Sequence, residues 1–193
     1  MTMPATQPTI VPPKTSRGRS WLRAPLILAA VLILVAATYA LAWYRAYVLS
    51  TEFMASAEVS FAAGDYLLAL SGFEEFDERS GRYVFRGGYA QVLRVWNNPY
   101  AWPVPESVAR ASARVDEIIE ERLGLADAER FVQVNIGRGN PYLGRIYLRL
   151  GELYEAEGDL RGAEEVYEEV LELFGRDAAL AERAEANLAR LRQ

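Results

Sequence analysis

The stretch YLRLGELYEAEGDLRGAEEVYEEVLELFG, residues 147–175, decides the fold that we expect for this chain. Apolar and small residues recur at helical spacing on both sides of its centre: Tyr147, Leu150, Gly151 and Tyr154, then Ala163, Tyr167, Val170, Leu171 and Phe174. Gly158-Asp159 lies between the two stripes, where the glycine ends one helix and the aspartate caps the next. The pattern predicts a helical hairpin, and the small residues Gly151 and Ala163 would let its two helices approach closely.

Residues 144–177 resemble one tetratricopeptide repeat, a helical hairpin of about 34 residues. The matching signature positions are Tyr147, Leu150-Gly151, Tyr154, Gly158-Asp159, Ala163, Tyr167 and Leu171. Gly175 stands where the family commonly has proline, and it still ends the second helix. The resemblance implies a stack of such hairpins that binds partners on the concave face formed by the first helix of each hairpin.

An earlier stretch, FMASAEVSFAAGDYLLALSGFEEF at residues 53–76, repeats part of this pattern. Aligning Gly64-Asp65 with the later turn brings small and aromatic residues into the expected places: Phe53, Ala57, Ala69 and Phe73. Ser56 and Ser60 depart from the pattern, because the family has leucine and tyrosine there. We interpret residues 50–80 as a divergent repeat, and the spacing of the two turns excludes a simple tandem array.

The remaining segments of the chain also show helical periodicity. We expect helices over residues 82–96, 106–123 and 126–136, and a capping helix over residues 178–192. The predicted fold is all-α: a single N-terminal transmembrane helix, then a tetratricopeptide-like α-solenoid of helical hairpins over residues 50–193, closed by the capping helix.

The segment APLILAAVLILVAATYALAWY, residues 24–44, carries no charge. As a helix it would extend about 30 Å, the thickness of the hydrocarbon core of a bilayer. Trp21 precedes it and three aromatic residues end it, which is typical of membrane interfaces: Trp43, Tyr44 and Tyr47. Residues 23–47 are therefore predicted to anchor the chain in lipid. A cleaved signal peptide is the alternative, with Ala40-Leu41-Ala42 as its cleavage site, although the apolar run is long for one.

Charge is distributed unevenly along the chain. Residues 1–22 are basic and rich in proline, threonine and serine, so we expect a disordered cytoplasmic tail. After Ser50 the chain has 16 arginines against 26 acidic residues, a net charge of −10. The positive-inside rule then places the C-terminal part outside the cytoplasm, and the use of arginine in place of lysine favours a bacterial source and its inner membrane. An acidic domain of this kind is a poor ligand for nucleic acid.

The composition excludes several kinds of chemistry. The chain has no cysteine and no histidine, and its only lysine is Lys14 in the tail. Thiol nucleophiles, imidazole bases, cysteine or histidine metal sites and Schiff-base lysines are therefore excluded from the folded part. Paired carboxylates such as Glu164-Glu165 lie on a helical surface, where solvent-facing acids are the usual explanation. We therefore predict no catalytic residue, no cofactor and no metal site.

Three groups of residues are candidates for contact with partners. By their position in the repeat, Arg145, Leu148, Glu152 and Glu155 would face the groove, although an ordinary solvent-facing surface has the same residue types. The repeats that grip a C-terminal carboxylate use lysine and asparagine at such positions. Because this chain has Leu148 and Glu152 there, that kind of ligand is not expected.

The second group is Arg82, Arg86 and Arg94, which the predicted helix 82–96 places on one side. They would bind an acidic protein loop or lipid headgroups, or form a solvated face. The third group is Tyr100 and Trp102 in the proline-rich segment NNPYAWPVP, residues 97–105. These rings would anchor a protein interface, or fold back as packing.

These features indicate a membrane-anchored scaffold or an accessory subunit of a membrane protein complex, with other proteins as partners and residues 24–44 in the bilayer. An anchored receptor for precursor or signalling proteins would have the opposite orientation, which the basic flank disfavours. A secreted binding module remains the alternative if the N-terminal segment is cleaved.

Overall fold

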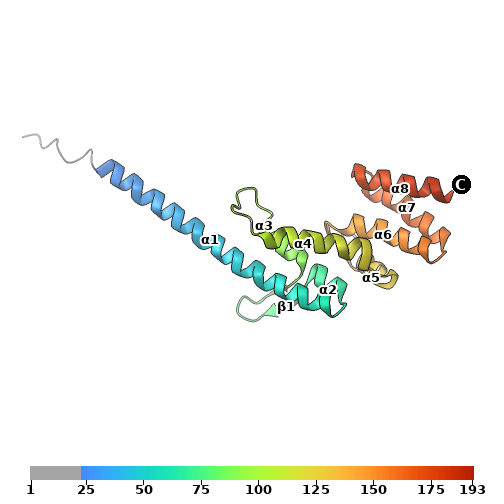
Figure 1. Cartoon of the computed structure of the whole chain (residues 1–193), viewed down its shortest axis with the longest axis horizontal. Helices are drawn as coiled ribbons and strands as arrows, with labels where there is room; N and C mark the ends of the chain where they lie inside the picture. The colour runs from blue at the N-terminus through green and yellow to red at the C-terminus, as the bar shows by residue number, and fades with distance from the viewer. Residues whose placement is uncertain (1–22) are drawn as a thin grey trace, which may run out of the picture. The chain divides into compact units, whose positions relative to one another are not determined.

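The computed structural model describes residues 23–193, so the predicted tail of residues 1–22 lies outside the described residues. The described residues divide into two units, residues 23–44 and residues 45–193. The elements, labelled in Figure 1, follow in this order: α1 (Arg23–Ala62), α2 (Tyr66–Ser71), β1 (Phe73–Asp77), β2 (Arg82–Arg86), α3 (Tyr89–Trp96), α4 (Glu106–Glu117), the π-helical segment η1 (Ile118–Arg122), α5 (Leu125–Asn135), α6 (Leu143–Ala156), α7 (Leu160–Phe174) and α8 (Ala178–Leu191).

The first unit is helical over its described residues. Its large side chains, from Leu26 to Tyr44, are almost all exposed, and they carry no charge. By length and composition, α1 contains one candidate membrane-spanning segment within Pro25–Ala62. The predicted long apolar helix near the N-terminus is therefore confirmed.

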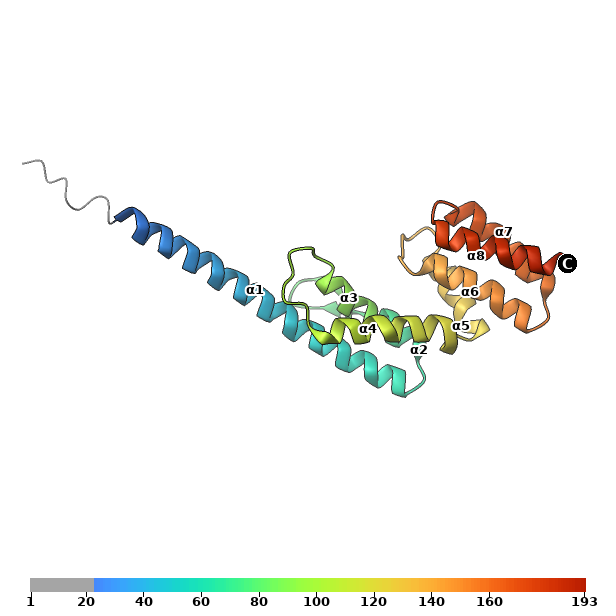
Figure 2. The ribbon, with the colours of Figure 1, turned by 45° about the horizontal axis from the view of Figure 1, so that its top comes forward.

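The second unit is helical apart from one small antiparallel hairpin of β1 and β2. Along the chain, α3 packs on α4, α5 on α6, α6 on α7 and α7 on α8. Contacts also skip one element, because η1 and α8 both reach α6. Figure 2 shows α6, α7 and α8 side by side at the C-terminal end. The predicted all-helical architecture is thus confirmed in its coarse form.

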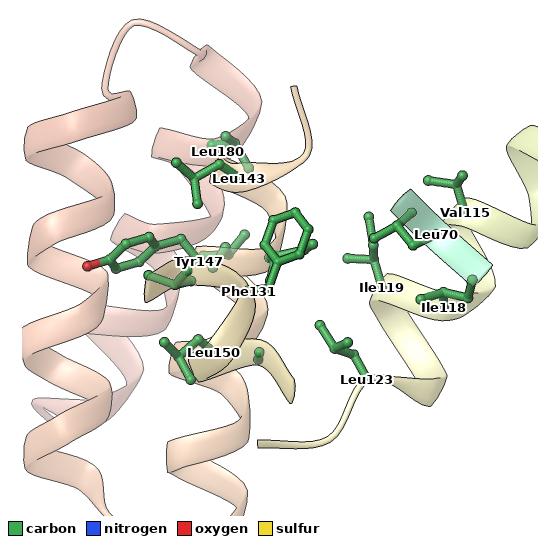
Figure 3. Packing of buried hydrophobic residues seen from close by; sticks show 14 of the residues in the cluster. Leu70, Val115, Ile118, Ile119, Leu123, Phe131, Leu143, Tyr147, Leu150 and Leu180 are labelled. Carbon is green, nitrogen blue, oxygen red and sulfur yellow. The ribbon is translucent and has the colours of Figure 1, made fainter. Parts of the chain in front are cut away.

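One hydrophobic core runs through this unit. In Figure 3, Leu70, Val115, Ile118 and Ile119 lie on one side, and Phe131, Leu143, Tyr147 and Leu150 lie on the other. The buried set extends from Phe53 on α1 to Leu188 on α8. Because α2, α4, η1 and α5 to α8 all contribute to this core, burial of apolar area holds them together.

The hairpin of α6 and α7 has the close approach that the sequence predicts. A Cβ atom added at Gly151 would lie 2.5 Å from Cε1 of Tyr167, and Ala163 is fully buried. Tyrosine hydroxyls add polar links between helices: Tyr147 donates to Glu169, Tyr167 to Glu155, and Tyr154 to Glu129. The small residues therefore let the two backbones pack closely, and the tyrosine hydroxyls link the helices by hydrogen bonds.

The helix predicted over residues 82–96 is wrong in its first half. Residues 82–86 form β2, which pairs with β1 so that Tyr83 lies opposite Phe76. Gly87 and Gly88 follow with positive φ angles of 68° and 85°, which an α-helix does not contain, and α3 begins only at Tyr89. The apolar spacing from Phe85 onward resembled a helix because it continued across these two glycines.

Residues 50–80, predicted as a divergent repeat, contain the end of α1, a turn, α2 and the start of the β1–β2 hairpin. The turn at Gly64-Asp65 has the same backbone form as the turn at Gly158-Asp159, since the aspartate N–H in each donates to a carbonyl five residues earlier at 2.9 Å. The second helix, α2, has only six residues and ends at Ser71, and β1 begins two residues later at Phe73. The stretch is a helix and a turn followed by a hairpin, so it does not form a full helical repeat.

Candidate functional site

Helix α6 carries the four residues that were expected to face a groove. Leu148 is fully buried in the core, so it lines no groove in this structure. Arg145, Glu152 and Glu155 are partly exposed, and each makes ion pairs with other elements. These three residues form a charged surface that α6 shares with its neighbours.

Arg145 links α6 to α4 and η1. Its guanidinium donates to Asp116 Oδ1 at 2.8 Å and to Glu120 Oε1 at 3.1 Å. Arg183 of α8 donates to Glu120 Oε2 at 3.4 Å and to Glu152 Oε1 at 2.9 Å. The carboxylate of Glu120 consequently lies between two guanidinium groups, and the network joins η1, α6 and α8.

This network keeps its carboxylate charged. Burial alone raises the pKa of Glu120, but hydrogen bonds and charges from Arg145 and Arg183 outweigh it, so the pKa lies below its usual value. Burial likewise lowers the pKa of each arginine, and the paired carboxylates outweigh it. A carboxylate held ionised is a poor proton donor, so the network is suited to ion pairing and not to general acid chemistry.

Beside the network, a shallow depression of about 400 Å³ opens at α6 and α8. Its lining combines acidic, amide and basic side chains: Glu152, Glu155, Ala156, Asn187 and Arg190. Arg190 donates to Glu155 Oε2 at 2.8 Å and to Asn187 Oδ1 at 3.1 Å. The hydroxyl of Tyr167 also donates to Glu155 Oε2, at 3.2 Å. These hydrogen bonds fix the positions of Glu155, Asn187 and Arg190 without a partner.

The lining of the depression offers both hydrogen-bond donors and acceptors. Glu152 and Glu155 accept hydrogen bonds and attract cations, whereas the amide of Asn187 both donates and accepts, as a peptide main chain requires. Both carboxylates are already paired with arginines, Glu152 with Arg183 and Glu155 with Arg190. Within residues 23–193, no cluster of histidine, cysteine, aspartate or glutamate could hold a metal ion.

The three arginines predicted on one helix do not share one. Arg82 and Arg86 belong to β2, and Arg94 lies in the last turn of α3. Arg86 pairs with Glu75 on the opposing strand at 3.0 Å, and Arg82 lies opposite Asp77. The prediction of a common helical face for these residues is therefore corrected, because β2 and the two glycines interrupt that helix.

Tyr100 and Trp102 lie in the connection between α3 and α4, as expected for a proline-rich segment. Both side chains are strongly exposed. They lie in a different part of the fold from the depression, so the structure does not bring all the predicted residues together.

Sequence reasoning missed the contribution of α8. Arg183, Asn187 and Arg190 recur at spacings of four and three, which puts them on one helical face next to α6. The apolar stripe of α8 indicated only a cap. The polar stripe beside it was the signal that could have identified the second wall of the depression.

Comparison with known proteins finds no matching family model, no similar curated protein and no similar solved structure.

Proposed function

We propose that this chain is a membrane-anchored binding protein that holds a partner polypeptide across α6 and α8. Its hairpin of α6 and α7 would be tetratricopeptide-like, and the chain would act as a scaffold or accessory subunit of a membrane complex. The observation that carries this proposal is the polar depression lined by Glu152, Glu155, Asn187 and Arg190. Two of its lining residues, Glu152 and Glu155, are among the four that the repeat pattern assigned to a groove.

The electrostatics indicate what the partner offers. The chain after Ser50 carries a net charge of −10, so its field is negative on average. This field would steer a basic segment towards the surface, where the polar side chains of the lining would form hydrogen bonds with its main chain. Nucleic acid would be repelled.

The apolar helix would determine where the second unit is located in the cell. With residues 24–44 in the bilayer, the positive-inside rule places the N-terminus in the cytoplasm and the second unit outside it. The anchor would then confine the depression to the membrane surface, which raises the effective concentration of membrane-bound partners.

Site-specific photocrosslinking in native membranes tests this proposal. A photoreactive residue at Asn187 should give a discrete crosslinked product, whereas the same residue at Arg161, exposed at the start of α7, should not. The product at Asn187 should weaken under Glu155→Arg, because this replaces a carboxylate of the lining by a cation that repels a basic segment. Equal crosslinking at both positions, or none at Asn187, would reject the depression as the binding site.

A further inference from the structure

The connection between α3 and α4, residues 97–105, has an unusual surface, and we name it the aromatic loop. It contains no charged residue in the sequence NNPYAWPVP. Tyr100, Trp102 and Val104 are 82%, 77% and 52% exposed. Large apolar side chains with such exposure on neighbouring positions usually mark a contact surface for lipid or for another molecule.

Further exposed apolar side chains lie where the second unit begins. Tyr47, Val48 and Leu49 on α1 are all exposed, and the next residue, Ser50, is fully buried. Both views of the ribbon show the aromatic loop running beside this part of α1 (Figures 1 and 2). The aromatic loop and this part of α1 therefore lie at the same end of the unit, and both expose apolar side chains.

Chain length fixes how far this surface can lie from the apolar span. Tyr47 follows Tyr44, the last residue of the span, by three positions, so even a fully extended chain would separate them by only about 10 Å. The polar layer of a bilayer is roughly 5 to 8 Å thick on each side of the hydrocarbon. If residues 24–44 cross the membrane, Tyr47 must lie in or next to the headgroup layer.

We propose that the aromatic loop, together with Tyr47, Val48 and Leu49, lies in the headgroup layer of the bilayer that holds the anchor. Tyrosine and tryptophan favour this layer because their rings are apolar while their O–H and N–H groups remain hydrated. Contact at two separate segments of the chain would limit rotation of the second unit about the single helix. The inference rests on the proposed membrane anchoring.

The lipid surface fits these residues better than a protein partner does. Two observations favour it: the loop lacks charge over nine residues, and its neighbour Tyr47 is tied within about 10 Å of the span. If a protein partner covered these side chains instead, they would be shielded from water only when that partner is present. Measurements on the purified chain in pure lipid therefore distinguish lipid from protein as the occupant.

Because the chain has no cysteine, single cysteines can carry an environment-sensitive fluorophore in full-length protein. The three sites are Val104 in the loop, Val134 on α5 as a matched control, and Val35 in the apolar span. Val104 and Val134 are 52% and 50% exposed, so they differ in location and not in residue type or exposure. Each labelled protein is reconstituted into phosphatidylcholine vesicles without any other protein.

We expect the label at Val104 to show blue-shifted emission, quenching by lipids brominated near the headgroup and protection from aqueous iodide, and the label at Val134 to show none of these. Water-like behaviour at Val104 with lipid-like behaviour at Val35 would overturn this inference alone, and the loop would then need a protein to cover it. Water-like behaviour at Val35 would overturn the membrane anchor, and this inference with it. Equal lipid signals at Val104 and Val134 would show general adhesion and also reject the loop as a specific contact.

Discussion

The backbone of Gly87 lies directly against the side chain of Ser56. A Cβ atom added at Gly87 would lie 2.5 Å from Ser56 Oγ and 3.0 Å from Ser56 Cβ. Ser56 was one of the two positions at which the first stretch departs from the repeat signature. The small serine therefore has a structural reason, because a leucine at this position would occupy the place where the base of the β1–β2 hairpin meets α1.

Gly87→Ala should destabilise the second unit more than Gly81→Ala does, although both glycines have similar positive φ angles of 68° and 64°. At Gly81 a Cβ meets nothing within 4 Å, so the cost is only that of the left-handed backbone, roughly 1 to 2 kcal/mol. Gly87→Ala adds overpacking of about 1 to 3 kcal/mol. Denaturant unfolding of the full chain in micelles, followed by near-ultraviolet circular dichroism, measures the difference; equal losses would show that the contact is unimportant.

The two Gly-Asp turns make a matched pair for capping. Asp159 accepts a hydrogen bond from the N–H of Gly162 at 2.9 Å, whereas Asp65 makes no such bond despite nearly the same φ and ψ. Asp159→Ala should therefore cost about 1 kcal/mol of unfolding free energy, and Asp65→Ala less than about 0.5 kcal/mol. Unfolding curves of the two variants test this directly, and a larger loss at Asp65 would contradict it.

Leu148 is fully buried in the core of the second unit. Leu148→Ala should destabilise the second unit by about 2 to 5 kcal/mol, because it opens a cavity in a fully buried site. Leu160→Ala, at an exposed leucine on α7, should change the free energy by less than about 0.5 kcal/mol. If thermal unfolding midpoints of both variants matched that of the wild type, Leu148 would belong to a surface, as the repeat position had suggested.

Acidification should weaken the ion-pair network. The folded-state pKa of Glu120 lies below the ordinary 4.5, so its charge stabilises the fold above pH 4.5 and loses that effect as the pH falls through the lowered pKa. Glu120→Gln removes this contribution, whereas the ion pair of Arg145 with Asp116 and that of Arg183 with Glu152 remain. Since these groups are between about one third and one half exposed, the difference from wild type at neutral pH should be about 1 kcal/mol or less.

That difference should shrink as the pH is lowered below 4.5. Unfolding curves of wild type and Glu120→Gln at several pH values measure it. A gap that stays constant or widens in acid would show that Glu120 is not stabilised as an anion by its two arginines.

Local signals explain what could be predicted at the C-terminal end. The spacing of Tyr147, Tyr154 and Tyr167 around a Gly-Asp turn depends on helical periodicity within one short stretch, and the hairpin has the predicted approach of Gly151 to Tyr167. The same argument found α8 from its apolar stripe. It failed over residues 73–86, where aromatic residues of the hairpin happened to continue the spacing of the following helix.

Only the wall of the candidate site that α6 forms could be predicted from the sequence. Spacing along α6 identified Glu152 and Glu155, but a helical repeat does not tell which neighbour will lie against a given face. Leu148 was assigned to the groove and is buried, while Arg190 came from a helix interpreted only as a cap.

The sequence by itself determined the uncharged apolar helix, the helical hairpin of residues 143–174 and the acidic character of the chain after Ser50, because each depends on composition or on spacing along one element. Only the tertiary structure decided that Glu120 and Arg183, 63 positions apart, share an ion pair, and that α6 and α8 together line a depression. Such contacts depend on how separate helices pack against one core, and packing of this kind is a property of the whole fold.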